Sequence, residues 1–411
     1  MKELEIKYKN FDLKKNSEKI KKNDKKINQI KNILLDLPAL KIVKDHKKIY
    51  KTINIAKHFS KNKKNIFIFG TGGSNFGSMA LINILQQKQK KNILFYDNID
   101  PIYFQNSIQK IDLNKSGFII ISKSGTTPET LSQIGCIIEL FKNKYSLKKF
   151  FKNCLIITEN KESPLRLIGL KIKCTILDHE LDIGGRYSVF SNVGMIPSII
   201  AGVEIKSFHK GAENIISNIN NNSFYKYIKL SQIFSSNIKK DFFANSVIFT
   251  YSAALYYFGK WYLQLWAESI GKNGMGITPI HSVGTTDQHS QLQLFLDGPK
   301  DKFYTFITTN NSKLGLKINK KIMETNNLAF LGGKRMGDLM QAEQKATIDT
   351  FKAKGIKFRE INLPKINEYY LGQLMALSMI ETIATCLFLK INPFDQPAVE
   401  QGKILTKKYL S

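Results

Sequence analysis

The chain is poor in cysteine, arginine and tryptophan. Its 411 residues include four cysteines and two tryptophans, and only four of its 62 basic residues are arginine. The cysteines are far apart in apolar surroundings, and none forms a Cys-x-x-Cys pair. They are Cys136, Cys154, Cys174 and Cys386. The simplest interpretation is buried, reduced thiols in a cytoplasmic protein.

Two further absences narrow the function class. We find no run near the roughly 20 apolar residues that a membrane helix requires, and the first seven residues lack the apolar core of a secretory signal. The net charge is +29, but the excess is almost all lysine spread along the chain. Because arginine is the better reader of phosphate and base edges, we expect no specific nucleic-acid partner.

Short apolar segments alternate with helix-length segments from residue 65 onward. The strands expected in the first cycle are residues 65–69, 92–96, 117–121, 154–157 and 174–177. The second cycle has expected strands at 246–251, 303–307 and 357–361 and helices at 253–267, 336–354 and 367–389. This alternation predicts α/β architecture with parallel sheets covered on both faces.

A polar, asparagine-rich segment lies between the two series of alternating strands and helices. We therefore expect five parts, bounded by changes in composition and pattern. They are an N-terminal helical segment (1–60), a first α/β domain (61–205), a helical connection (206–240), a second α/β domain (241–390), and a C-terminal turn and helix (391–411).

The most informative stretch is residues 122–130, Ser-Lys-Ser-Gly-Thr-Thr-Pro-Glu-Thr, between an expected strand and an expected helix. The amide groups of a first helical turn lack partners within the helix and can bind an anion. The hydroxyl groups can donate further hydrogen bonds, and Gly125 lets the chain bend close to the ligand. The pattern indicates an anion site, although the same residues could form only a helix cap.

A second glycine-rich turn, residues 70–77, follows the first strand. Asp97 lies 20 residues beyond Gly77, as in a dinucleotide site, but Asn75 stands where the Gly-x-Gly-x-x-Gly spacing needs glycine. We therefore reject NAD and expect a turn that approaches another ligand, with Gly73 and Ser74 available to a polyol.

Three other segments carry candidate reactive groups. Gly185 precedes Arg186 in a glycine turn, which would place a fixed cation beside a ligand unless the turn is an ordinary surface feature. Glu268 ends an aromatic helix and is either a structural acid or a general base. His289 is either a proton shuttle or a packed or capping residue, and the His-x7-His spacing from His281 matches no common zinc pattern, so we expect no metal.

Taken together, these motifs closely resemble those of the glucose-6-phosphate isomerase family. The matching motifs are Ser-Lys-Ser-Gly-Thr-Thr-x-Glu-Thr, Gly-Gly-Arg-Tyr-Ser, Glu-Ser-x-Gly-Lys and Phe-Asp-Gln-x-x-Val-Glu-x-x-Lys. The resemblance extends from about residue 66 to residue 403. It implies two sugar-isomerase (SIS) domains, flavodoxin-like with doubly wound parallel sheets, and additional N- and C-terminal helices. It also implies a homodimer with composite active sites, a sugar-phosphate substrate, and no cofactor.

The resemblance also implies residue roles. The residues that would bind the sugar phosphate are Ser122, Ser124, Thr127 and Thr130, with Lys123 nearby. The residues that would line the sugar site are Gly73, Ser74, Gly185, Gln264 and Gln396.

Four further residues would act on the sugar itself. Glu268 would move a proton between C1 and C2 while Arg186 stabilises the enediolate. His289 would assist ring opening, from the neighbouring subunit, and Lys403 would lie at the ring and hydroxyl end. A base held over two carbons and a cation facing the oxyanion are what aldose–ketose isomerisation requires.

The chain departs from the family pattern at Asn192, Thr286 and the pair Pro397-Ala398, none of which is a reactive group. The sequence leaves two alternatives. One is another SIS-type phosphosugar isomerase, acting on mannose 6-phosphate or an amino-sugar phosphate. The other is a non-catalytic sugar-phosphate sensor, against which the retained Glu268 and Lys403 argue.

Overall fold

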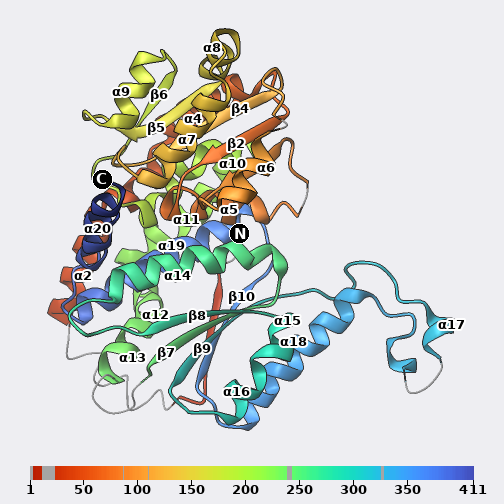
Figure 1. The fold of residues 1–411 in the computed structure, drawn as a ribbon. Coiled ribbons are helices and arrows are strands. Elements are labelled where there is room, and N and C mark those ends of the chain that lie inside the picture. Colours follow the sequence, from red (N-terminus) through yellow and green to blue (C-terminus); the bar gives the residue numbers. More distant parts are fainter. Residues whose placement is uncertain (1–2, 12–23, 87, 110, 238–242, 325–327) are drawn as a thin grey trace.

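Two five-stranded sheets organise the computed structural model (Figure 1), which describes residues 3–11, 24–86, 88–109, 111–237, 243–324 and 328–411. The first sheet is parallel throughout, in the order β3-β2-β4-β5-β6. Its strands are β2 (Asn65–Phe69), β3 (Asn92–Tyr96), β4 (Ser116–Ile121), β5 (Cys154–Glu159) and β6 (Thr175–His179). This is a flavodoxin-like order, as the sequence predicts.

Helices cover both faces of the first sheet. One face packs on α4 (His46–Ser60), α5 (Phe76–Asn83) and α10 (Asn192–Ala201). The other face packs on α6 (Pro101–Ile108), α7 (Pro128–Leu140), α8 (Lys144–Lys152) and α9 (Pro164–Lys171). Every residue of the central strand β4 is buried, which explains its continuous apolar sequence.

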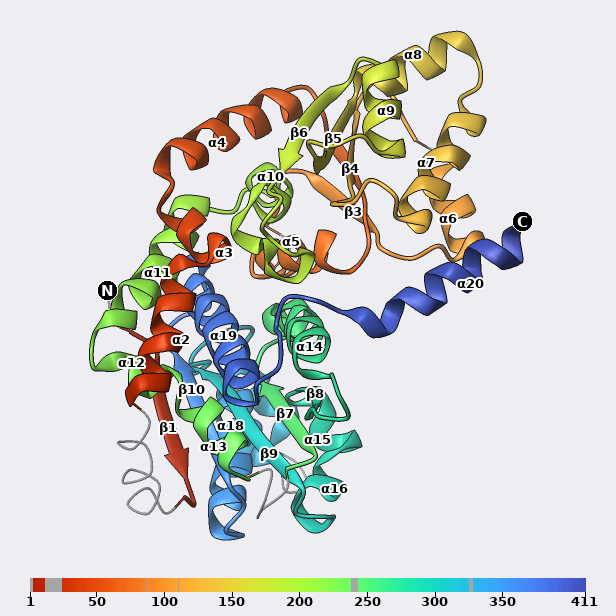
Figure 2. The same ribbon diagram turned by 90° about the vertical axis from the view of Figure 1, so that its left-hand side faces the viewer.

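The second sheet repeats this order and adds an antiparallel strand, giving β1-β10-β9-β7-β8. Its strands are β1 (Glu5–Lys9), β7 (Asn245–Thr250), β8 (Thr278–Val283), β9 (Lys302–Thr309) and β10 (Phe358–Leu363). On one face lie α14 (Tyr256–Ile270) and α19 (Glu368–Phe388), which separate the two sheets (Figures 1 and 2). The other face packs on α16 (Leu292–Asp297), which follows α15 (Thr286–Ser290), and on α18 (Met336–Ala353).

The remaining helices connect these layers. Residues 205–237 contain α11 (Ile205–Ser217), α12 (Ser223–Tyr227) and α13 (Lys229–Asn237). The N-terminal part contains α2 (Asp24–Asp36) and α3 (Pro38–Lys41), and the chain ends with α20 (Glu400–Leu410). The predicted α/β class with two similar domains is confirmed.

Two strands differ from expectation. The segment expected to be helical from residue 1 contributes β1, where Ile6 and Tyr8 alternate with charged residues along an edge of the second sheet. That period of two is the pattern of a half-buried edge strand. Strand β8 follows a glycine-rich turn and carries Pro279, which suits an edge strand and weakens the sequence signal.

One helix is more apolar than the sequence analysis allowed. Helix α19 has 21 residues and enough apolar character to cross a membrane, but most of it is buried in the protein. It packs against α11, α13 and α14, so it is a core helix between the domains.

Candidate active site

The loop 122–130 lies at the carboxyl end of β4, beside the carboxyl end of β2. In a sheet of this order, the connections from these two strands diverge and leave a crevice where ligands bind. The short turn η2 (Gly72–Ser74) leaves β2, and α7 leaves the loop after β4. The two motifs that the sequence singled out therefore meet at the same edge.

The hydroxyl groups of the loop converge on the start of α7. Ser122 Oγ lies 2.8 Å from Thr127 Oγ1, and Ser124 Oγ accepts a hydrogen bond from the amide of Thr126. Thr127 is the residue before the helix, and its side chain caps no helical amide. Thr130 is fully buried, and its hydroxyl has no hydrogen-bond partner among the described residues. The loop thus presents amide and hydroxyl donors at a helix N-terminus, which suits a phosphate.

Gly125 makes this bend possible. Its φ is +67°, and a Cβ atom there would lie 2.2 Å from Ser163 Oγ. Both the left-handed backbone and the close contact exclude larger residues.

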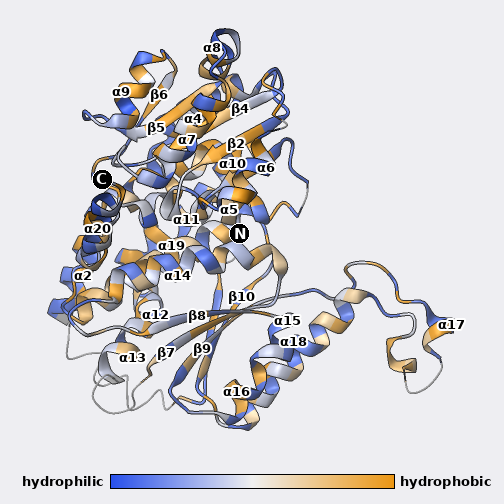
Figure 3. Ribbon diagram, viewed as in Figure 1, coloured by the Kyte–Doolittle hydropathy of each residue, from blue (hydrophilic) through white to orange (hydrophobic). Residues whose placement is uncertain are grey.

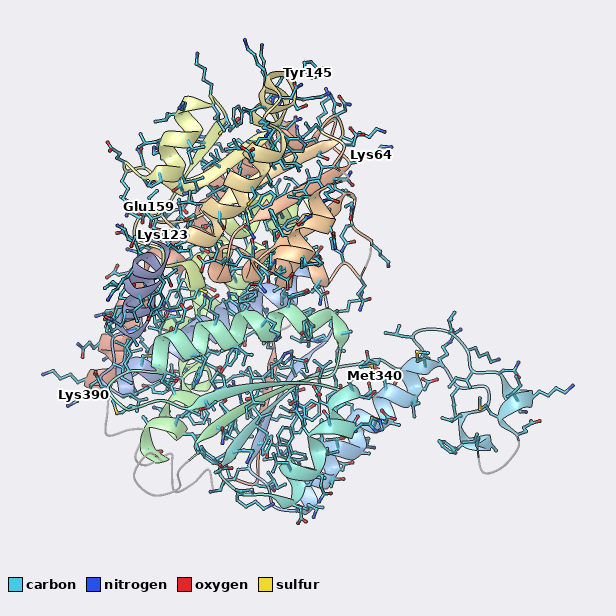
Figure 4. The ribbon with its side chains drawn as sticks, in the orientation of Figure 1. Lys64, Lys123, Tyr145, Glu159, Met340 and Lys390 are labelled. Carbon is cyan, nitrogen blue, oxygen red and sulfur yellow. The ribbon has the colours of Figure 1, made fainter. Side chains whose placement is uncertain are left out.

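Lys123 points away from this loop toward two other segments. Its Nζ donates a 2.8 Å hydrogen bond to the carbonyl of Leu181 and lies 3.4 Å from the buried carboxylate of Glu159 (Figure 4). Lys161 pairs with the other oxygen of Glu159. Lys123 therefore links the loop to the segment that leads into Gly185 and Arg186.

The two glycine turns touch each other. A Cβ atom on Gly73 would lie 2.3 Å from the carbonyl carbon of Gly185, at the start of η3 (Gly185–Phe190). Ser188 Oγ also donates to the carbonyl of Gly73 at 3.3 Å. Ser74 stands at the end of the first turn, beside Gly70. Glycine at position 73 is therefore required for the turns that carry Ser74 and Arg186 to meet.

Arg186 joins the two domains. Its buried guanidinium uses all of its donors: Nε bonds to Ser269 Oγ, Nη1 to Glu268 and Gln396, and Nη2 to the carbonyls of Pro393 and Asp395. The planar guanidinium has five N–H groups in a fixed geometry, so these five hydrogen bonds use all of them.

Glu268 lies at this junction near the end of α14. Its Oε2 accepts from Arg186 Nη1 at 3.1 Å, and its Oε1 accepts from Gln264 Nε2 at 2.8 Å. About a third of its side chain is exposed, so a ligand can reach the carboxylate. Gln264 also lies against Gly72, which ties this helix to the first glycine turn. The arrangement provides a fixed, accessible carboxylate beside a cation.

The C-terminal residues complete one side of the site. Gln396 Oε1 accepts from Arg186 Nη1 at 2.8 Å. Lys403 is on α20, where its Nζ pairs with Glu400 at 2.7 Å. It lines a groove of about 500 Å³ together with Thr126 and Pro128. Lys403 and the loop 122–130 therefore face a common space.

His289 is not brought to this site within one chain. It is exposed on the short helix α15, after β8. The ring of His281, in β8, packs on Gly259 in the first half of α14, whereas Glu268 lies near the other end of that helix. The contacts thus join two groups of predicted residues and leave His289 outside both. One group is Gly73, Gly185, Arg186, Gln264, Glu268 and Gln396, and the other is the loop 122–130 with Lys403.

Tyr187 and Ser269 belong to the site but were not predicted. The Tyr187 hydroxyl donates to the carbonyl of Pro393 at 2.9 Å and lies 2.8 Å from Ser269 Oγ, which also accepts from Arg186. Burial raises the pKa of Tyr187 to about 12, so the hydroxyl stays protonated. Tyr187 directly follows Arg186 and Ser269 directly follows Glu268 in the sequence, and these neighbouring positions could have indicated that both belong to the site.

The other sequence-based expectations have mixed outcomes. Asp97 is exposed after β3, and no group of three metal-ligating side chains occurs among the residues described here. Cys154 and Cys386 are buried and all four cysteines are free thiols, but Cys136 is exposed and Cys174 is only partly buried. The expectation that all four thiols are buried was therefore wrong: Cys136 lies on the outward face of α7.

Known proteins are similar to this chain in sequence and in fold. A sequence model described as phosphoglucose isomerase matches residues 27–411. A probable glucose-6-phosphate isomerase from Methanococcus maripaludis is 35% identical over 90% of this chain and 84% of its own. The glucose-6-phosphate isomerase of Campylobacter jejuni is 32% identical over 85% of this chain and 86% of its own.

Solved structures share the fold. A hypothetical protein from Thermus thermophilus has a TM-score of 0.88 at 24% identity and covers 99% of this chain and 100% of its own. A glucose-6-phosphate isomerase from Chlamydia trachomatis has a TM-score of 0.76 at 22% identity, covering 89% of this chain and 73% of its own. The extent of the sequence matches shows that this chain belongs to the phosphoglucose isomerase family.

Proposed function

We propose that the protein interconverts glucose 6-phosphate and fructose 6-phosphate, the glycolytic and gluconeogenic isomerisation. The observation that carries this proposal is the junction of Glu268 with Arg186, beside a hydroxyl-lined loop at the neighbouring strand ends. It joins a base, a cation and a phosphate-sized anion site, which this reaction needs together.

The loop 122–130 holds the phosphate through its hydroxyl groups and the first amides of α7. This remote contact fixes the sugar, so that binding energy helps to place the reacting carbons. Gly73, Ser74, Gly185, Gln264 and Gln396 line the space between the phosphate and the reacting end.

Glu268 removes a proton from C2 of the open aldose and returns it to C1, while the hydroxyl proton moves from O2 to O1, so that C1 becomes an alcohol and C2 the ketone. The intermediate is a cis-enediolate, whose negative oxygen is stabilised by Arg186. Because every N–H of Arg186 is already engaged, the oxyanion must replace one existing acceptor, and we propose that it replaces one of the two side chains on Nη1, Gln396 or Glu268. Lys403 and His289 assist ring opening, in which a proton moves between the ring oxygen and the C1 hydroxyl.

His289 reaches this site from a second subunit, in a homodimer with composite active sites. Its exposed position at the far end of α14 from Glu268 supports this arrangement. The cytoplasmic location stays a prediction, which fractionation of cells would test.

A coupled assay tests the proposed reaction. Fructose 6-phosphate should yield glucose 6-phosphate, detected by reduction of NADP with glucose-6-phosphate dehydrogenase. Mannose 6-phosphate and glucosamine 6-phosphate, assayed in parallel, should be much poorer substrates. Binding of sugar phosphates without any turnover would contradict the proposal and favour a sensor, and a preference for another phosphosugar would reassign the substrate.

A further inference from the structure

Two side chains of the sequence motifs have no role in the proposed reaction, and the structure pairs them with each other. Lys272 ends the motif Glu-Ser-x-Gly-Lys just after α14, and Asp395 lies in the motif Phe-Asp-Gln-x-x-Val-Glu-x-x-Lys near the end of the chain. Lys272 Nζ lies 3.1 Å from Asp395 Oδ1. The hydrogen bond from Lys272 holds the pKa of Asp395 below its ordinary value. An ion pair therefore joins the two motifs.

The ammonium group of Lys272 is buried, and main-chain carbonyls supply its other partners. The side chain is only 8% exposed. Its Nζ donates to the carbonyl of Ser269, in the last turn of α14, at 2.9 Å and to the carbonyl of Asn392, after α19, at 2.6 Å. Burying a charge is costly unless it is paired and hydrogen-bonded, and these three acceptors meet that condition. Lys272 thus ties the end of α14 to the segment that follows α19.

A second cation holds the same short segment. Arg186 Nη2 donates to the carbonyls of Pro393 and Asp395, and its Nη1 donates to the side chain of Gln396. We call residues 392–396 the anchored turn. Its carbonyl groups face two buried cations, one from each domain, so its position is fixed relative to both domains.

The chain beyond the anchored turn depends on this attachment. The structure describes every residue of α20, and none of them is buried. Figure 3 shows hydrophilic and hydrophobic residues mixed along this helix. Helix α20 runs from the anchored turn toward the first domain (Figure 2), where Lys403 lines the groove that it shares with the loop 122–130. The anchored turn therefore sets the direction in which α20 leaves the second domain.

We infer that Lys272 is a positioning residue for the proposed isomerisation, because it holds the anchored turn against α14 and so places Gln396 and Lys403 relative to Glu268. Its own ammonium group is occupied by protein acceptors, so it acts through these other residues. Glu268 and Ser269 are adjacent, so the same helix end carries the base and the carbonyl that holds Lys272. A displacement of about 1 Å in such a site can lower the rate by about 10²-fold. The inference rests on the proposed function.

Lys272→Met tests this role because it keeps an unbranched side chain and removes the ammonium group. In the full-length protein, kcat with fructose 6-phosphate should fall at least about tenfold. Inhibition by inorganic phosphate should change less than about twofold, because the loop 122–130 is untouched. Lys272→Arg retains a cation with several donors and should recover most of the lost kcat.

Lys302 provides a matched control. Its side chain is 7% exposed, and its Nζ lies 2.6 Å from Asp301 Oδ1 and 3.4 Å from the carbonyl of Pro299. These partners belong to the turn before β9 and not to the candidate site. Lys302→Met therefore removes an equally buried, paired ammonium group, and it should leave kcat within about twofold of the unmodified protein.

Hydrogen exchange measured by mass spectrometry separates positioning from a general loss of stability. In Lys272→Met, exchange should become faster in peptides from residues 390–411 and stay unchanged in α7. Lys302→Met should not accelerate exchange in residues 390–411. Equal losses of kcat in the two methionine variants would overturn the inference. A loss of kcat in Lys272→Met without faster exchange in residues 390–411 would also overturn it.

The outcomes also separate this inference from the proposed function. An active protein in which Lys272→Met behaves like Lys302→Met would overturn the positioning role and leave the isomerase intact. A protein that turns over no phosphosugar would overturn both. Should Lys272→Met fail to fold, Asp395→Asn decides, because that carboxylate is half-exposed. It should lower kcat severalfold, and an unchanged kcat would contradict the inference.

Discussion

The two domains share one strand order, but the connection that follows the equivalent strand, β4 in the first sheet and β9 in the second, differs between them. In the first sheet, the loop after β4 is six residues long, is rich in hydroxyl groups and leads directly into α7. In the second sheet, the equivalent connection, between β9 and α18, contains α17 (Lys320–Met323) and projects from the body of the molecule (Figure 1). A single scaffold thus supplies the proposed phosphate loop in one domain. In the other domain it supplies an extended surface and, through α14, the carboxylate of Glu268.

Because of this difference, the proposed phosphate binding and the proposed proton transfer depend on different domains. The proposed phosphate-binding elements belong to the first domain, whereas Glu268 comes from the second and is hydrogen-bonded to Arg186 and Gln264. Substitutions in the two domains should therefore change different measured quantities.

The largest expected effect comes from the second domain. Glu268→Gln keeps the shape of the side chain and removes the base, so turnover should fall by roughly 10²- to 10⁴-fold. Competitive inhibition by inorganic phosphate should be unchanged, because the loop 122–130 is untouched. Steady-state kinetics would measure both, and near-normal turnover would exclude Glu268 as the base.

The next expected effect is a loss of stability in acid, caused by a partly buried histidine that the second domain contains and the equivalent strand of the first does not. Burial lowers the pKa of His281, on the edge strand β8, to about 4, whereas the corresponding edge strand β3 contains no histidine. The unfolded chain therefore binds this proton at higher pH than the folded protein does. The stability that depends on neutral His281 is fully present above pH 6.5. The free energy of unfolding should therefore decrease by about 2–3 kcal/mol as the pH falls from 6.5 to 4.

Chemical unfolding at pH 7, 5.5 and 4.5 would measure this loss. His281→Gln should be less sensitive to acid than the unmodified protein while remaining folded at pH 7. An identical pH dependence in the two proteins would show that His281 does not titrate in this way.

A third effect belongs to the first domain. Replacing Thr127 and Thr130 by valine removes two hydroxyl groups while keeping side-chain volume. Each hydrogen bond to a charged group contributes about 1.5–3 kcal/mol, so affinity for substrate and for inorganic phosphate should fall together by at least tenfold. Serine replacements retain the hydroxyl groups and serve as controls. Equal phosphate affinity in the valine variant would remove these residues from the phosphate site.

The smallest effect should come from Lys123, which the resemblance places near the phosphate. Its ammonium group is already bound by Leu181 and Glu159, so we expect Lys123→Met to lower turnover severalfold with little change in phosphate affinity. Glu159→Gln should act in the same direction. A large, selective loss of phosphate binding would instead show that Lys123 moves to the anion.

The fold was largely predictable because buried parallel strands leave continuous apolar runs, as in β4. Strands β1 and β8 were missed because edge strands are half-exposed, and their signals are weak beside lysine-rich or glycine-rich flanks. The site residues were predicted from motifs. The contacts that organise them, such as Gly73 against Gly185 and Tyr187 against Pro393, join segments far apart in sequence, so composition and spacing do not reveal them.

Deuterium exchange during turnover is the most direct test of the central claim, that Glu268 moves a proton between C1 and C2 of a sugar whose phosphate is held by the other domain. Fructose 6-phosphate incubated with the protein in D2O should yield glucose 6-phosphate with deuterium at C2, observed by NMR. Glu268→Gln should lose this incorporation and still bind inorganic phosphate. Product formed without any deuterium, or undiminished incorporation by Glu268→Gln, would contradict the account.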